Sequence, residues 1–154
     1  MTIRHYHLDK YSITYDQLQT NTIQLAIPIH LLAKSVSVAI DSTGVKEDSG
    51  HFTLTSEMVK HLKYAYLEAY ADAPSATDAS VDVELYNVTD GAVVTKVTYA
   101  GDSGLKTSSD IASTLKGLAG KVLSARINVT TASGTSGATQ TFRSVVLRLV
   151  LGIS

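Results

Sequence analysis

The sequence predicts a mainly β protein, an antiparallel sandwich of two sheets with one short helix near residues 109–118. Charged residues make up only 18% of the 154 residues, and the chain is rich in Ser, Thr, Val and Ala, which suit pleated strands. Several segments alternate apolar and polar residues with the period of two that a half-buried strand requires. Polar sequences with turn-forming residues separate these segments.

The clearest element is a hairpin over residues 80–99. Asp90-Gly91 marks the reversal, and apolar residues alternate with polar ones on both sides of it. A two-residue loop would place Leu85 opposite Lys96 and spoil the apolar face. A three-residue loop, 89–91, with Gly91 in the left-handed region keeps the apolar side chains together. It predicts three pairs: Val81 with Tyr99, Val83 with Val97, and Leu85 with Thr95.

The alternation predicts further strands along the whole chain. These segments are residues 2–8 (with 11–15 as a continuation or a partner), 22–29, 35–41, 51–55, 61–72, 121–130 and 139–153. Pro28 cannot donate to a ladder, so 22–29 is expected at an edge or ends there. Residues 139–153 are apolar on both faces, with Phe142, Val146 and Val150 on one, which predicts a central strand or one covered by a partner. Residues 41–50 and 131–138 are expected to be exposed loops.

Two segments have helical features. Residues 109–118 are expected to begin with Ser109 as the N-cap and Asp110 in the first turn, and Gly120 is expected to stop the helix. Residues 56–70 are ambiguous, because their apolar residues fit a helical face while their tyrosines alternate as in a strand. We predict a strand near 61–72, with a helix at 56–70 as the alternative.

These elements predict a single domain over residues 1–154. About eight to ten strands in two packed sheets favour a jelly roll, which removes most open sheet edges. An immunoglobulin-like sandwich is the second choice, because the chain lacks the cysteines and the tryptophan of that fold.

Composition excludes several classes of function. The net charge is -1 and the basic residues are scattered, which argues against a nucleic-acid partner. The absence of cysteine removes disulfides and thiolate metal sites. No stretch is apolar enough to insert in a membrane, and the start, Met1–Lys10, does not read as a Sec-type signal peptide.

No catalytic residue, metal site or cofactor is predicted. His5 and His7 share a strand face, but the further ligands of a metal-binding cupin are missing. Asp82 and Glu84 have the spacing of a glycosidase pair, yet a solvated polar face is the favoured interpretation. Calcium ligands (Asp102, Asp110 and the loop 41–48) and N-glycosylation sequons at Asn87 and Asn128 are weaker candidates still.

The one candidate site is a face of Tyr64, Tyr66 and Tyr70. Alternate tyrosines on a strand are suited to stack on sugar rings or to form a subunit interface. Packing or an interface is the favoured interpretation.

Four segments resemble single jelly-roll β-sandwiches: 66–70, 83–91, 125–129 and 147–150. The style is similar to small structural or spike proteins of virions, including those of viruses of thermophilic archaea, and to carbohydrate-binding modules. The resemblance covers roughly residues 60–153 and implies a sandwich with a surface or binding role.

The sequence therefore predicts a structural subunit of a virion or other extracellular assembly, which acts through contacts with itself or other subunits and without catalysis. Residues 1–15 and the two-faced strand 140–153 are its expected contact elements. The alternatives are a carbohydrate-binding attachment module and a cupin-like metal-dependent enzyme built on His5 and His7.

Overall fold

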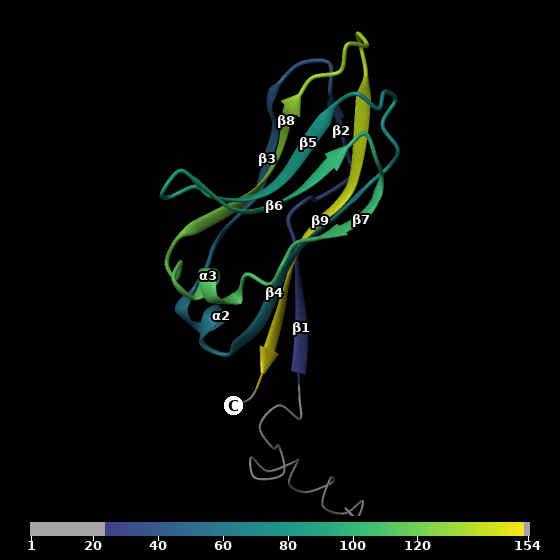
Figure 1. Ribbon diagram of the computed structural model, residues 1–154. Coiled ribbons are helices and arrows are strands. Elements are labelled where there is room, and N and C mark those ends of the chain that lie inside the picture. Colours follow the sequence, from purple (N-terminus) through teal and green to yellow (C-terminus); the bar gives the residue numbers. More distant parts are fainter. Residues whose placement is uncertain (1–23, 153–154) are drawn as a thin grey trace, which may run out of the picture.

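The computed structural model describes residues 24–152, which form two antiparallel sheets packed face to face (Figure 1). The strands are β1 (Gln24–His30), β2 (Val36–Ala39), β3 (Gly44–Thr53), β4 (Leu62–Ala71), β5 (Ser80–Asn87), β6 (Ala92–Ala100), β7 (Gly104–Thr107), β8 (Val122–Thr131) and β9 (Thr139–Gly152), and the helices are α2 (Ser56–Lys60) and α3 (Ala112–Lys116). The predicted mainly β, two-sheet sandwich is confirmed.

The antiparallel pairs are nested within one another along the chain. β1 and β2 pair with β9, β3 pairs with β8, β4 with β7, and β5 with β6. One sheet has the order β1-β9-β4-β7, with β2 also on β9, and the other has the order β3-β8-β5-β6. Nested pairs that alternate between two sheets are the arrangement of a jelly roll.

The core lies between the two sheets and is built by strand alternation. Leu123, Ala125, Ile127 and Val129 of β8 are each buried, as the alternation predicts. β9 lies between β1 and β4, so its apolar residues on both faces have neighbours within its own sheet. Its position confirms the central strand that the sequence predicted.

The hairpin of β5 and β6 has the three predicted pairs but a longer loop. The register shifts after Leu85, so that Asn87 pairs with Ala92 and the loop comprises residues 88–91. The Asn87 side chain stabilises this four-residue loop. Its Oδ1 accepts from the Asp90 N–H at 3.1 Å, and its amide nitrogen donates to the Asp90 carboxylate at 2.8 Å. Gly91 has the expected left-handed conformation, with φ of 70°.

The prediction of a loop at residues 41–50 is wrong, because β3 already begins at Gly44. β3 is an edge strand of its sheet and carries Lys46, Glu47 and Asp48. Register shifts between Val45 and Glu47 and between Ser49 and Phe52 interrupt its alternation. The local sequence of a polar edge strand with bulges resembles that of a loop, because its apolar and polar residues do not alternate regularly.

The ambiguous segment contains both predicted structures, one after the other. α2 is a single turn capped by Thr55, whose hydroxyl accepts from the Met58 N–H at 3.3 Å, and β4 follows it. The alternative of one helix over 56–70 is therefore wrong. The strand near 61–72 is confirmed.

The helix near 109–118 exists but is shorter than predicted, and Ser109 does not cap it. Ile111 occupies the N-cap position without a side-chain hydrogen bond. Asp110 instead accepts from the N–H groups of Ala112, at 3.0 Å, and of Ala65, at 2.9 Å, which ties the helix start to β4. The helix ends at Lys116, before Gly120.

Phe142 lies in the core rather than on the outer face. The register of β4 and β9 shifts between Tyr70 and Ala71. Side chains of β9 before Ser144 therefore face the opposite side of the sheet from the one that simple alternation predicts. Phe142 is fully buried, with its ring 5.6 Å from that of Tyr99 in an edge-to-face arrangement. The predicted strands at 2–8 and 11–15 lie outside the described residues.

Candidate functional site

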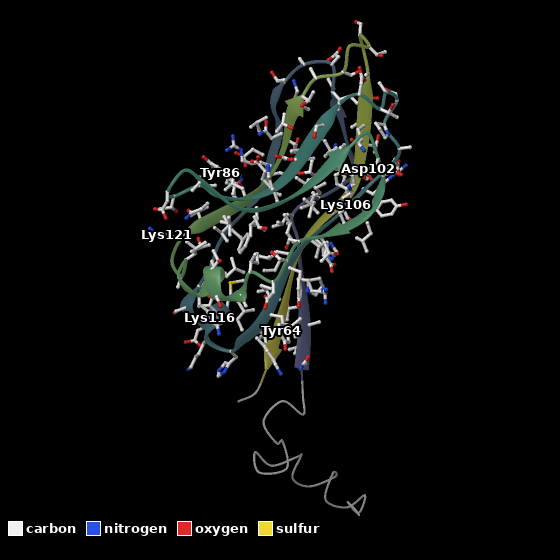
Figure 2. All side chains as sticks on the ribbon, in the orientation of Figure 1. Tyr64, Tyr86, Asp102, Lys106, Lys116 and Lys121 are labelled. Atoms are coloured by element: carbon white, nitrogen blue, oxygen red, sulfur yellow. The ribbon has the colours of Figure 1, made fainter. Side chains whose placement is uncertain are left out.

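The three predicted tyrosines lie on the outer face of β4. Ala65, Leu67, Ala69 and Ala71 of this strand are completely buried, so the alternate positions face away from the core. Tyr64 and Tyr70 are 38% and 43% exposed, and Tyr66 between them is half-buried. The structure therefore brings the predicted residues together on one face. Figure 2 shows Tyr64 toward the end of β4 at which β1 and β9 project.

Cationic side chains lie close to two of the tyrosine rings. The rings of Tyr64 and Tyr66 are 6.4 Å apart, with an angle of 25° between their planes. The Arg148 guanidinium lies 4.9 Å from the centre of the Tyr66 ring, and the Lys63 ammonium lies 5.6 Å from that of Tyr64. Both distances are within the range of cation–π attraction.

An ion pair interrupts the tyrosine row. Arg148 Nε donates to Glu68 at 2.8 Å, and Glu68 lies between Tyr66 and Tyr70 on the same face. Tyr70 pairs across the sheet with Leu105 of β7, which is 65% exposed. The outer face therefore contains two exposed aromatic areas, around Tyr64 and around Tyr70 with Leu105, and no continuous aromatic platform.

The strand β1 exposes a second apolar surface. Ile29, Ile27 and Leu25 pair with core residues of β9 and lie on the core-facing side of the sheet. Their exposure increases along the strand, because Ile29 is half-buried, Ile27 is 37% exposed and Leu25 is 57% exposed. In Figure 1, β1 and the end of β9 extend past the second sheet, which leaves these side chains uncovered.

The sequence interpretation did not identify β1 as a site. A signal was present, because no Asp, Glu, Lys or Arg occurs between Asp16 and Lys34. A long uncharged segment that includes an edge strand is unusual for a strand that faces only water.

Asp82 and Glu84 are buried on the outer face of β5. Their spacing made them the candidate glycosidase pair. They are 3% and 5% exposed. Asp82 accepts from the Lys96 ammonium and from the Thr98 hydroxyl, both at 2.6 Å, and Glu84 accepts from Asn128 at 3.2 Å. The carboxylate beside it raises the pKa of Lys96. A covered and hydrogen-bonded pair of this kind is placed to stabilise the sheet.

The two sequons lie on the same sheet. Asn87 is 3% exposed and its amide is bonded to Asp90, so the folded chain presents no free amide nitrogen there. Asn128 is partly buried and donates to Glu84.

The candidate metal ligands are not brought together within residues 24–152. No group of three or more His, Cys, Asp or Glu side chains suited to a metal occurs in this part of the chain. Asp102 pairs with Lys106 at 2.5 Å, as their neighbouring positions in Figure 2 suggest, and this pair lowers the pKa of Asp102. His5 and His7 lie outside the described residues.

The glycine-rich tip 131–138 is closed by hydrogen bonds to Asp78. The Ser133 hydroxyl donates to Asp78 at 2.5 Å and the Gly134 N–H donates to it at 2.8 Å, and both bonds lower the pKa of Asp78. Elsewhere, Leu32, Lys34, Ser35, Glu47 and Ser49 help to line an open groove of about 420 Å³ beside β3. None of the helices among the described residues has the length and apolar character needed to cross a membrane.

Comparison with known proteins gives no family. No protein-family model matches the chain, and no curated protein matches it. A solved structure titled as that of infectious bursal disease virus, Gx strain, is 15% identical, with a TM-score of 0.41 over 84% of this chain and 32% of that one. The chain thus spans about a third of the length of this neighbour. The neighbour comes from a virus.

Proposed function

We propose that the protein is a structural subunit of a virion or other extracellular assembly, acting through protein–protein contacts without catalysis. The exposed apolar strand β1 carries this proposal. An isolated subunit leaves Leu25 57% and Ile27 37% exposed, and so forgoes part of the roughly 1.5–3 kcal/mol that full burial of each side chain provides. Exposed apolar surface of this kind is typical of protein contacts.

The polar groups of the sandwich support a role without catalysis. Asp82, Glu84 and Asp78 have hydrogen-bond partners within the chain, and the first two are covered by neighbouring side chains. A catalytic acid or base must reach its substrate directly or through one water. These carboxylates are better suited to stabilising strands and loops.

Solution mass tests the proposal. Light scattering of the full-length protein over a range of concentrations, with electron microscopy of the same samples, should reveal an oligomer, tube or shell. The mass of the chain is 16.4 kDa, so even a dimer is readily distinguished. A mass that stays at 16.4 kDa at every concentration, with no particles visible, would contradict self-assembly.

A carbohydrate-binding attachment module is the second candidate, and the exposure of Tyr64 and Tyr70 favours it. Aromatic rings stack on the apolar faces of sugars, and both rings are open to solvent. The spacing is less favourable, because the Arg148–Glu68 pair separates the two rings. A bound glycan would contact one ring area at a time.

A glycan array followed by titration separates the two candidates. Val94, on β6 of the other sheet, is partly buried against the core and provides the control. Glycan binding that is lost when Tyr64 and Tyr70 are replaced by Ser, and retained in Val94→Ala, would support the attachment module. A protein that binds no glycan and assembles in solution would support the structural subunit alone.

A further inference from the structure

The free edge of β1 differs from the other sheet edges among the described residues. β7 and β2 are only four residues long, β3 has two register shifts and three consecutive charged side chains, and β6 carries Lys96 and a register shift. Short length, bulges and charges are the features that keep natural sheet edges from pairing with other chains. β1 has seven residues, regular pairing and no formally charged side chain at neutral pH other than His30 when protonated.

From this contrast, and resting on the proposed function, we infer that β1 is a docking strand for a second copy of this chain. The second copy adds its own β1 antiparallel to this one, so that one sheet continues across the two subunits. Strand addition of this kind uses main-chain hydrogen bonds for affinity and side-chain contacts for specificity. A strand without charges meets an identical strand without repulsion.

Pro28 determines which groups of β1 face the partner. Proline has no N–H, and the β1–β9 ladder is regular at Pro28, so the Pro28 nitrogen points to the free edge. Residues of the same parity then present their main-chain groups to that edge. These are the N–H and C=O of Gln24, Ala26 and His30, together with the C=O of Pro28.

A two-fold axis at Ala26 pairs the edge-facing groups of Gln24, Ala26 and Pro28. Ala26 exchanges both main-chain bonds with Ala26 of the partner subunit, and the Gln24 N–H donates to the carbonyl of Pro28 of the partner subunit. A two-fold contact is self-complementary, so every bond occurs twice. The proline costs only the two bonds that it cannot donate.

The same axis places the exposed apolar side chains against one another. Leu25 lies opposite Ile27 of the partner subunit, and Ile27 lies opposite Leu25 of the partner subunit, on the core-facing side of the joined sheet. Facing side chains at such positions are close enough to pack. The contact therefore covers the two side chains that the second sheet of the sandwich leaves open.

The first experiment compares Leu25→Asp with Leu105→Asp by concentration-dependent light scattering of the full chain. Both leucines are exposed, at 57% and 65%, and both lie on edge strands of the same sheet, so neither variant removes a core contact. We expect Leu25→Asp to raise the dissociation constant of the dimer at least ~100-fold, because two carboxylates would face the apolar contact. Leu105→Asp is expected to leave the dissociation constant unchanged.

The second experiment maps the contact through single cysteines, which the natural chain lacks. Ala26→Cys should form a disulfide-linked dimer under mild oxidation, since paired strands hold the two Cα atoms about 5.5 Å apart. Val93→Cys, on the edge strand β6 and 47% exposed, is the control and should remain monomeric on a denaturing gel.

The outcomes separate this inference from the proposed function. Assembly that persists in Leu25→Asp, with no cross-link in Ala26→Cys, would overturn the β1 contact and leave the structural role intact. Loss of assembly in Leu105→Asp alone would place the interface on the outer face and overturn it as well. A wild-type chain that is monomeric at all concentrations would contradict both.

Discussion

Tyr99 joins the two sheets through one side chain. It is completely buried, its ring packs against Phe142, and its hydroxyl lies 2.6 Å from the Ala69 carbonyl oxygen and 2.9 Å from that of Gly104. Burial raises the pKa of this phenol, so the hydroxyl keeps its proton and remains a donor to β4 or to the start of β7. The residue therefore connects β6 of one sheet to β4 and β7 of the other.

Replacing Tyr99 by Phe tests this connection. The variant keeps the ring but removes the one hydroxyl proton that the Ala69 or the Gly104 carbonyl accepts, which should lower the free energy of unfolding by about 1–2 kcal/mol. Urea denaturation measures the loss. Tyr70→Phe is the matched control. Tyr70 is 43% exposed, so water can take the place of the lost hydroxyl and the free energy of unfolding should change little. Equal stability of Tyr99→Phe and the natural protein would contradict the bridging role.

Asp78 provides the acid-sensitive contact of the loop tip. Its pKa is lowered chiefly by the Ser133 hydroxyl and then by the Gly134 N–H. A carboxyl group with a lowered pKa in the folded state stabilises the fold above its ordinary pKa, and this contribution is lost as the pH falls through the folded value, below about pH 4.

Replacing Ser133 by Ala should raise the pKa of Asp78 toward its ordinary value and move acid unfolding to higher pH. Carboxyl ¹³C NMR titration and circular dichroism measure the two effects. Ser109→Ala, at an exposed position, is the control and should change neither. An unchanged Asp78 titration in Ser133→Ala would show that the hydroxyl is not the cause.

At the scale of elements, two glycines with nearly the same conformation have different surroundings. Gly101, between β6 and β7, has φ of 71°, and Gly137, before β9, has φ of 73°. A Cβ on Gly101 would lie 2.0 Å from the Thr77 carbonyl oxygen, whereas nothing lies within 4 Å of a Cβ on Gly137. Alanine substitutions at these two glycines therefore distinguish the free-energy cost of a left-handed backbone from the additional cost of a steric clash.

Gly137→Ala should therefore lose about 1–2 kcal/mol of unfolding free energy, the cost of a left-handed non-glycine residue. Gly101→Ala should lose roughly 3 kcal/mol or more, because the main chain at Thr77 must also move. Thermal and urea unfolding of both variants give the comparison. Equal losses would indicate that the loop at Thr77 adapts without cost.

At the scale of the whole molecule, the helices and the projecting strands share one end of the jelly roll. The helices α2 and α3 lie beside the start of β4, and at this same end β1 and the end of β9 extend beyond the second sheet (Figure 1). The chain segment that precedes β1 joins the sandwich at this same end.

Deletion of residues 2–8 tests the predicted contact role of the N-terminal segment. We expect the shortened chain to lose any assembly larger than the β1 dimer. Its far-UV circular dichroism and unfolding transition should stay within experimental error of the full chain, because the described core starts at Gln24. Light scattering measures the assembly. A shortened chain that still forms assemblies larger than a dimer would contradict the role of residues 2–8 without affecting the β1 contact.

The sequence alone determined the features that depend on strand periodicity. The mainly β class, the three hairpin pairs from Val81 to Leu85 and the buried residues of β8 follow from alternation, because a strand always turns successive side chains to opposite faces. The shared face of Tyr64, Tyr66 and Tyr70 follows from the same rule.

Only the tertiary structure decided what covers each face. A register shift moved Phe142 into the core, and neighbouring strands buried Asp82 and Glu84 on a face that alternation alone marks as solvated. The exposure of Leu25 depends on where the second sheet ends, and that sheet is built from strands distant in the sequence. Periodicity is a local property of the backbone, whereas coverage depends on contacts between segments far apart along the chain.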